Sequence, residues 1–335
     1  MTIGIDELVS HANLQKRLFT PGPASLMVEN IMGLKPCFGR GDIDFETIEN
    51  KVLHQIKKIA GQEKIVRMQG SATLALEIAI LNFLYGKVLL VSTGFYSSRL
   101  YELLTVAKDE IKSITQIDVL PYNQIQTNTQ LNYDWVVACS TETSCGLRLP
   151  ITLLGSLAKN VNAKLFLDAT ASIGLENNHE VADITCFSSC KGLFGLTGAG
   201  FIAYNGDEVN EVKSFNLRLN THVEKKVTGP LHSICSLSEV LPKHDEFRSS
   251  VIMNKEYFVK KFKEDLFYSE ENQPLLCTRV NRRLTSLNPK VILYSPRVEI
   301  SGSVVCHLGE VHLGRNGMGT IIEELIPQSL CQIEN

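Results

Sequence analysis

The sequence lacks the features that mark several classes of protein. Its formal net charge is only −3, so no strong overall field attracts nucleic acid or an anionic membrane. The nine cysteines form no paired C-x-x-C framework, and Cys186 and Cys190 have no second pair or nearby histidine to complete a zinc site. No apolar run approaches the length that crosses a membrane. We therefore expect a globular protein that binds no metal, nucleic acid or membrane.

The start of the chain also lacks a secretory signal. The segment MTIGIDELVSHANLQKR contains early acidic residues and no apolar core. Internal repeats and low-complexity tracts are absent too. Together with the unpaired cysteine usage, this favours a reducing, cytoplasmic location.

What is present is an ordinary globular composition with alternating structural patterns. The chain has 335 residues, 44% hydrophobic and 21% charged, which suggests one large domain and a smaller one. Helical spacing and continuous apolar runs alternate along it. This alternation predicts an α/β fold with a mostly parallel sheet sandwiched by helices. The expected helices cover 44–60, 71–85, 96–107 and 151–160, and the expected strands 64–69, 87–92, 111–120, 133–140, 164–169, 183–189 and 198–205.

Beyond about residue 245 the alternation stops. The segment 247–267 is amphipathic and helical, and short β-rich runs follow at 290–296 and 299–308. We expect a large N-terminal domain with its arm over 1–245, and a small α+β C-terminal domain over 246–335.

Reactive side chains follow several of the expected strands. Asp168 ends one strand, Glu142 and Thr143 follow another, and Lys191 follows a third. Gly70-Ser71 lies where a strand turns into a helix, whose free N–H groups and positive dipole end suit a phosphate. Ligands of open α/β sheets collect at the carboxyl ends of the strands. An anion-binding helix start, a carboxylate, a pair of polar side chains and a lysine at one edge of the sheet fit the chemistry of pyridoxal phosphate (PLP).

Each of these signals has an ordinary structural explanation. A Gly-Ser pair before a helix is usually only a cap, in roughly three cases of four. An aspartate at a strand end is more often structural than catalytic, and Lys191 alone could face solvent. The joint occurrence of the four signals is what favours a functional site.

Six segments occur in a fixed order along the chain: FTPGP near the start, QGSATLALE (69–77), GFYSSR (94–99), TETSCG (141–146), LDATASIG (167–174) and SSCKGLFGLTG (188–198). Together they resemble the class V aminotransferases, and most closely the 2-aminoethylphosphonate–pyruvate transaminases. The resemblance runs from about residue 18 to 235. The lysine motif, with an aspartate 23 residues before Lys191, is its most specific part. The resemblance implies the PLP fold-type I architecture.

The same resemblance implies roles for individual residues. Lys191 would hold PLP covalently and move a proton during catalysis, and Asp168 would pair with the pyridine nitrogen. Tyr96 would stack on the ring, and Thr143 would contact its hydroxyl side. The phosphate site would contain Gly70, Ser71, Ala72 and Ser189.

Dimer formation and substrate recognition are also implied. In family members a T-P-P segment enters the partner subunit's phosphate site, and TGPLH (228–232) stands in its place here, with Thr228 as the donor. This implies a homodimer with composite active sites. Arg40 is a candidate for binding a phosphonate or carboxylate, against the alternative of an ion pair with Asp42 or Asp44. Arg315, in an imperfect match to the family's R-x-G-x-x-G segment, is the second candidate.

The resulting hypothesis is transfer of the amino group of 2-aminoethylphosphonate to pyruvate, which gives phosphonoacetaldehyde and alanine. A serine or alanine transaminase acting with glyoxylate or pyruvate is the alternative, because few side chains separate the two. A cysteine desulfurase-like lyase is less favoured, since Cys190 and Tyr96 stand where desulfurases carry histidines. A non-catalytic relative is least favoured, because folding alone would not require both Lys191 and Asp168.

Overall fold

The computed structural model of the protein describes residues 4–36, 41–125, 132–314 and 322–328. Its centre is a seven-stranded sheet with strand order β2-β10-β9-β8-β5-β3-β4. Strands β9, β8, β5, β3 and β4 run parallel, and β10 is antiparallel to both of its neighbours. The strands are β2 (Lys64–Gln69), β3 (Gly86–Ser92), β4 (Ile114–Pro121), β5 (Trp135–Cys139), β8 (Lys164–Asp168), β9 (Ile184–Ser188) and β10 (Ala199–Tyr204).

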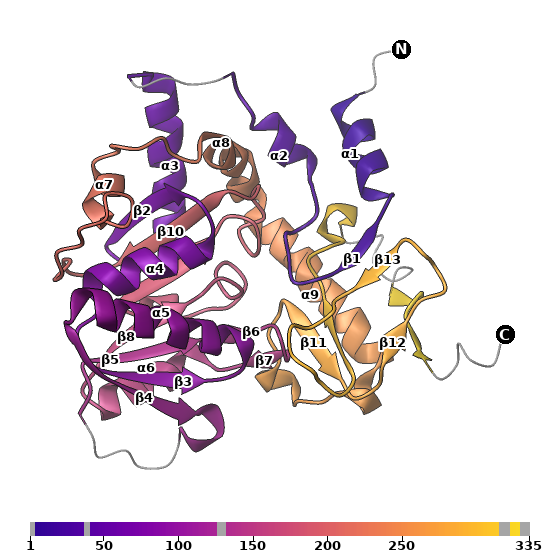
Figure 1. Ribbon diagram of the computed structural model, residues 1–335. Helices are drawn as coiled ribbons and strands as arrows, with labels where there is room; N and C mark the ends of the chain where they lie inside the picture. The colour runs from indigo at the N-terminus through magenta and orange to yellow at the C-terminus, as the bar shows by residue number, and fades with distance from the viewer. Residues whose placement is uncertain (1–3, 37–40, 126–131, 315–321, 329–335) are drawn as a thin grey trace.

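Helices cover both faces of this sheet (Figure 1). Helices α4 and α5 share one apolar core with the strands, and α3, α6 and α8 share the core of the opposite face. The predicted mostly parallel α/β sandwich is therefore confirmed. The helices of this part are α3 (Ile43–Ala60), α4 (Ala72–Phe83), α5 (Phe95–Ile111), α6 (Ile151–Asn160), α7 (Leu219–Val223) and α8 (Leu231–Val240).

Local sequence explains where the helix α3 begins and ends. The side chain of Asp42 accepts hydrogen bonds from the backbone N–H groups of Asp44 and Phe45, which satisfies donors that the first turn leaves open. The helix ends at Gly61, whose φ of 86° lies in the left-handed region that glycine adopts without steric cost. Its apolar face, with Val52 and Ile56, is buried against the sheet.

The C-terminal part consists of one long helix and small two-stranded sheets (Figure 1). The predicted helix over 247–267 is shifted toward the N-terminus, because after Lys261 the chain turns into a short 3₁₀ helix, after which Leu266 forms a β-bridge with Val280. The strands expected in 290–296 and 299–308 are present in shortened form. The elements are α9 (His244–Lys261), β11 (Cys277–Val280), β12 (Leu284–Thr285), β13 (Val291–Leu293), β14 (Ser303–Cys306) and β15 (Ile326–Pro327).

The N-terminal arm lies alongside this C-terminal part. After α1 (Ile5–Asn13), strand β1 (Arg17–Phe19) pairs in parallel with β13, and α2 (Val28–Met32) follows. Figure 1 shows α1 and β1 beside the orange and yellow C-terminal elements. The predicted domain boundary near residue 245 falls at the start of α9, and the arm crosses it through β1. The division into two domains stays a prediction.

Short elements complete the chain. No helix within the described ranges is long and apolar enough to span a membrane. A small hairpin is formed by β6 (Thr141–Glu142) and β7 (Leu147–Arg148). The 3₁₀ helices are η1 (Tyr122–Gln124), η2 (His179–Val181), η3 (Leu241–Lys243), η4 (Lys263–Asp265), η5 (Glu270–Asn272) and η6 (Val311–Leu313).

Candidate active site

A cavity of about 420 Å³ lies at the edge of the sheet where the parallel strands end. A larger one of about 610 Å³ lies among α1, α2 and α9, but it contains none of the strand-end groups predicted from the sequence. The chemistry therefore points to the smaller cavity. Its lining is Gly70, Ser71, Ala72, Thr73, Tyr96, Arg99, Cys139, Thr141, Thr143, Asp168, Thr170, Ala171, Ser188, Cys190, Lys191, Thr197, Gly198 and Arg297.

The sheet brings these side chains together because its strands point the same way. Asp168 is the last residue of β8, and Lys191 follows the end of β9. Tyr96 lies in the first turn of α5, directly after β3. Strand β2, separated from β9 by the single antiparallel strand β10, ends at the same edge and leads to Ser71. The predicted edge of reactive groups is thus a single cavity wall.

The carboxylate of Asp168 is buried and held by three donors. Its Oδ1 accepts hydrogen bonds from the backbone N of Thr170 at 3.0 Å and from the Thr170 hydroxyl at 2.5 Å. Its Oδ2 lies 3.4 Å from a guanidinium nitrogen of Arg99. The carboxylate orientation is therefore fixed from two directions.

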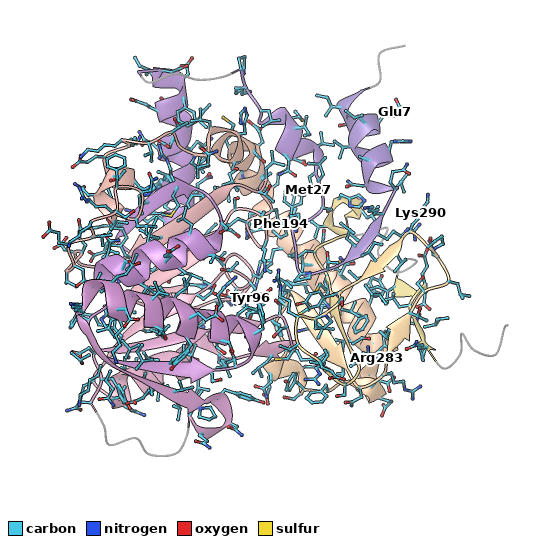
Figure 2. All side chains as sticks on the ribbon, viewed as in Figure 1. Glu7, Met27, Tyr96, Phe194, Arg283 and Lys290 are labelled. Carbon is cyan, nitrogen blue, oxygen red and sulfur yellow. The ribbon has the colours of Figure 1, made fainter. Side chains whose placement is uncertain are left out.

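Lys191, Tyr96 and Arg99 lie close together on the cavity wall. The Lys191 Nζ is 5.9 Å from the centroid of the Tyr96 ring, and the Arg99 guanidinium carbon is 4.8 Å from the same centroid. Figure 2 labels Tyr96 at the boundary between the large part and the C-terminal part. Each of the two cationic groups gains from the negative quadrupole of the Tyr96 ring.

The FTPGP segment packs against Lys191. The backbone N of Ala24 donates to the carbonyl of Cys190 at 2.8 Å. A Cβ on Gly22 would lie 3.1 Å from the Lys191 Cγ, and the Gly22 φ of +137° is one that other residues rarely adopt. The FTPGP segment thus lies directly against the lysine side chain.

Glu142 and Thr143 have different surroundings. Glu142 is fully buried and accepts hydrogen bonds from the hydroxyl of Thr93 and the backbone N–H groups of Tyr96 and Ser97, so it holds the start of α5. Burial raises the pKa of Glu142 above its usual value, and the donors oppose that rise. Thr143 instead lines the cavity, and its hydroxyl has no hydrogen-bond partner among the described residues.

The predicted phosphate residues fall into two groups. Gly70, Ser71 and Ala72 line the cavity at the N-terminus of α4, where the Ser71 hydroxyl also accepts a hydrogen bond from the backbone N of Leu74 at 3.4 Å. Ser189 does not line the cavity. Its buried hydroxyl donates to the carbonyls of Leu196 and Ala199. The phosphate role of Ser189 stays a prediction.

The remaining predicted residues lie elsewhere. Thr228 lines a separate surface cavity of about 490 Å³ that also contains Glu49 and Arg67. Arg40 and Arg315, the two substrate candidates, lie outside the described residues.

Sequence reasoning did not single out several residues of the cavity wall. Arg99 follows Tyr96 by three residues and lies on the same helix face, a spacing that could have indicated it. Arg297 comes from an irregular segment after β13, where no periodic pattern points to the cavity.

The cavity fits PLP on physical grounds. Thr141 and Thr143 have buried hydroxyls with no hydrogen-bond partner within the described part of the chain, and both line the cavity. Leaving a buried hydroxyl unpaired costs about 1–3 kcal/mol, so a polar ligand there would relieve a cost. Gly198 also lines the cavity, and its carbonyl accepts a hydrogen bond at 2.9 Å from the backbone N of Gly70, just before the N-terminus of α4, the end that suits a phosphate.

Comparisons with known proteins agree with this geometry. The chain is 26% identical over 277 residues to the bifunctional phosphonoacetaldehyde hydrolase/aminoethylphosphonate transaminase of Clostridioides difficile strain 630, covering 75% of this chain and 42% of that protein. It is 24% identical over 253 residues to the 2-aminoethylphosphonate–pyruvate transaminase of Cupriavidus taiwanensis, covering 67% and 66%. The chain thus spans less than half of the first relative and about two thirds of the second.

The fold is shared with solved structures. The alanine–glyoxylate aminotransferase of Nostoc sp. superposes with a TM-score of 0.76 at 17% identity, covering 96% of this chain and 95% of that one. The family model described as aminotransferase class-V matches residues 42–221, more than half of the chain. The chain therefore belongs to the class V aminotransferases, a PLP-dependent family with the fold-type I architecture.

Proposed function

We propose that the protein transfers the amino group of 2-aminoethylphosphonate to pyruvate, giving phosphonoacetaldehyde and alanine. One observation carries the proposal of transamination: a single cavity joins the amine of Lys191, the buried carboxylate of Asp168 and the ring of Tyr96 at the N-terminus of α4. The choice of donor is supported by relatives named 2-aminoethylphosphonate–pyruvate transaminases and by the TETSCG segment.

When bound, PLP supplies an electron-accepting ring that stabilises negative charge on the carbon bearing the amine. In our proposal Lys191 is the covalent anchor, and its Nζ would carry the proton from that carbon to the cofactor. The packing of Gly22 against the Lys191 side chain restricts where the amine can point. Restriction of this kind serves proton transfer, which requires the amine within hydrogen-bond reach of the carbon.

Asp168 would hold the proton on the ring nitrogen of the cofactor. The two hydrogen bonds from Thr170 aim its Oδ1, and the Arg99 guanidinium neutralises part of its charge from the other side. Tyr96 would stack on the ring, and the hydroxyls of Thr141 and Thr143 would donate to its polar edge. The phosphate would lie at Gly70, Ser71 and Ala72, against the free N–H groups of α4.

We also propose a homodimer in which Thr228 reaches the partner subunit's phosphate site. The position of Thr228 in a surface cavity outside its own active-site cavity supports this arrangement. Size-exclusion chromatography with light scattering tests the dimer. Mixing inactive Lys191→Ala chains with inactive Thr228→Ala chains tests the shared site, because only a composite site would regain activity. The cytoplasmic location stays a prediction.

A product assay tests the donor and the acceptor together. Purified protein with PLP, 2-aminoethylphosphonate and pyruvate should form alanine and phosphonoacetaldehyde in equal amounts. Formation of glycine from glyoxylate with alanine or serine as donor, and no reaction of the phosphonate, would replace this proposal by the serine/alanine type of transaminase.

A further inference from the structure

Two charged side chains occupy buried positions that the sequence pattern assigns to apolar residues. Glu49 belongs with Val52 to the buried face of α3. In β2, Arg67 alternates with Val66 and Met68, which pack on the side of α4 and α5, so Arg67 faces α3. The Arg67 Nε donates to the Glu49 Oε1 at 2.7 Å, and the two side chains are 6% and 1% exposed. An ion pair is thus built into the core between α3 and β2.

The stability of the fold does not by itself explain this ion pair. Burying two charges costs desolvation free energy, and apolar residues at the same positions are often equally stable or more so. Burial raises the pKa of Glu49, whereas hydrogen bonds from Lys225 and Arg67 lower it, and the resulting pKa lies below its usual value, so the carboxylate is charged. The Nη1 of Arg67 is buried and has no hydrogen-bond partner among the described residues. The ion pair therefore points to a role other than stability.

The ion pair lies next to the loop 224–229, which follows α7 and carries Thr228. Helices α3 and α7 both pack beside β2, so the loop leaves α7 close to the pair (Figure 1). The Lys225 Nζ donates to the Glu49 Oε2 and ties the start of the loop to the carboxylate. One surface cavity is lined by both parts, namely by Glu49, Arg67, Lys225, Thr228 and Gly229.

At the other end of the loop, Gly229 lies directly against the guanidinium of Arg67. A Cβ on Gly229 would lie 2.5 Å from the Arg67 Cζ, and 2.7 and 2.9 Å from two of its nitrogens, which is closer than a side chain can approach. Gly229 stands where the T-P-P segment of family members has its first proline. A proline restricts the backbone through its ring. In this chain the guanidinium of Arg67 fills that space and restricts the loop by contact.

We propose that Arg67, held in place by Glu49, positions the loop 224–229 and so presents the hydroxyl of Thr228 to the phosphate site of the partner subunit. Arg67 is a positioning residue, because it acts through Gly229 and is not among the described residues that line its own active-site cavity. The inference rests on the proposed function, which assigns Thr228 to the partner's site. It adds that a buried guanidinium supplies the restriction that a proline would otherwise give.

Hydrogen exchange of the PLP-saturated protein, measured by mass spectrometry, tests whether Arg67 holds the loop. Arg67→Met should speed the exchange of the backbone amides of residues 224–229 by about 3- to 10-fold, because the contact with Gly229 is lost. The control is Arg148→Met, which removes an arginine that pairs with Glu176 at 2.8 Å and does not line the cavity of Thr228. It should leave exchange in this loop unchanged. Equal exchange in Arg67→Met and wild type would overturn the inference.

A double-mutant cycle on PLP affinity tests whether Arg67 acts through Thr228. Thr228→Ala should raise the Kd of PLP by about 10-fold and Arg67→Met by about 3- to 10-fold. In the Thr228→Ala background, Arg67→Met should change the Kd by less than about 2-fold, because the threonine that it positions is absent. Arg148→Met should have the same effect on the Kd in both backgrounds. A full effect of Arg67→Met without Thr228 would show a structural role only and would contradict the inference.

The outcomes separate this inference from the proposed function. If Arg67→Met does not fold, Gly229→Ala makes both tests from the loop side, because its Cβ would displace the guanidinium. Unchanged PLP affinity in Thr228→Ala would remove Thr228 from the proposed site. Hydrogen exchange then decides whether Arg67 still holds the loop. If wild type transfers no amino group, the proposed reaction falls, and both tests remain valid because they require only that PLP binds.

Discussion

The sheet edge and the C-terminal mouth of the cavity are built in different ways. At the sheet edge, Asp168 and Lys191 stand at the ends of buried strands, and Asp168 is fixed by three donors. At the mouth, Arg297 stands on an irregular segment and is held by a ring contact. A strand end places a group accurately because the whole sheet positions it. A loop can change its side chains without disturbing the core.

Two buried glutamates, one in each region, differ in the number of hydrogen bonds that they accept. Glu142, at the sheet edge, accepts hydrogen bonds from three backbone N–H groups and two hydroxyls, those of Tyr96, Ser97, Ser144 and Thr93. Glu310, beneath the arm in the C-terminal part, accepts one at 3.0 Å from the backbone N of Leu18. Burial raises the pKa of Glu310 to about 7. The buried carboxylate at the sheet edge is thus held by more donors than the one in the C-terminal part.

Lys191→Ala should have the largest effect. It removes both the covalent anchor and the proton carrier, so turnover should fall by about 10⁴-fold or more. Cofactor affinity should fall less, because the groups around the phosphate remain. Steady-state assays and a PLP-binding titration measure the two effects. Turnover close to wild type in this variant would remove Lys191 from the chemistry.

Asp168→Asn should follow, with turnover lower by about 10²- to 10³-fold through loss of the charge that would stabilise the protonated ring nitrogen. The side chain keeps its size, and one oxygen can still accept from Thr170. Thr170→Val, which removes only the orienting hydroxyl, is the matched control and should cost about 10-fold at most. Equal rates for Asp168→Asn and wild type would contradict the account of the sheet edge.

Glu310→Gln should change stability rather than catalysis. The pKa of Glu310 is raised from its usual 4.5 to about 7, so between these values the folded chain binds more protons than the unfolded chain. The free energy of unfolding of wild type therefore loses a contribution on the order of 3 kcal/mol as the pH rises through this window. The glutamine variant lacks that loss.

Urea unfolding at pH 5 and pH 8 measures this difference. Relative to wild type, the free energy of unfolding of Glu310→Gln should rise between pH 5 and pH 8. The control Glu299→Gln, which removes an exposed carboxylate, should show no such rise. If the free energy of unfolding of wild type and Glu310→Gln depended on pH in the same way, the buried carboxyl of Glu310 would not lower the stability of the folded chain at high pH.

Tyr96→Leu should have the smallest effect of the four. It removes the ring that we expect to stack on PLP and that also contacts Arg99, while Tyr96→Phe keeps the ring and both contacts. Aromatic contacts contribute about 0.5–1.5 kcal/mol, so PLP affinity should fall by roughly 2- to 10-fold in the leucine variant only. Fluorescence titration of PLP into both variants checks this. An equal loss in the phenylalanine variant would assign the effect to the hydroxyl instead.

The contrast also explains which features could be predicted from the sequence. Continuous apolar runs such as KVLLVS predict buried strands, and the direction of parallel strands then places Asp168 and Lys191 at one edge. The motif also includes Ser189, whose hydroxyl donates to the carbonyls of Leu196 and Ala199 and which does not line the cavity, so its phosphate role stays a prediction. Arg297 could not be predicted, because its position depends on packing between distant segments. The candidates Arg40 and Arg315 lie outside the described residues.

The most direct test of the central claim is the visible absorption spectrum of the purified, PLP-loaded protein during stepwise addition of substrates. The account predicts a yellow band in the protein alone, bleaching with 2-aminoethylphosphonate in the absence of acceptor, and return of the band with pyruvate. Bleaching by alanine or serine but not by the phosphonate would keep the transaminase and change its donor. A protein that develops no band with added PLP would contradict the assignment of Lys191 and of the cavity around it.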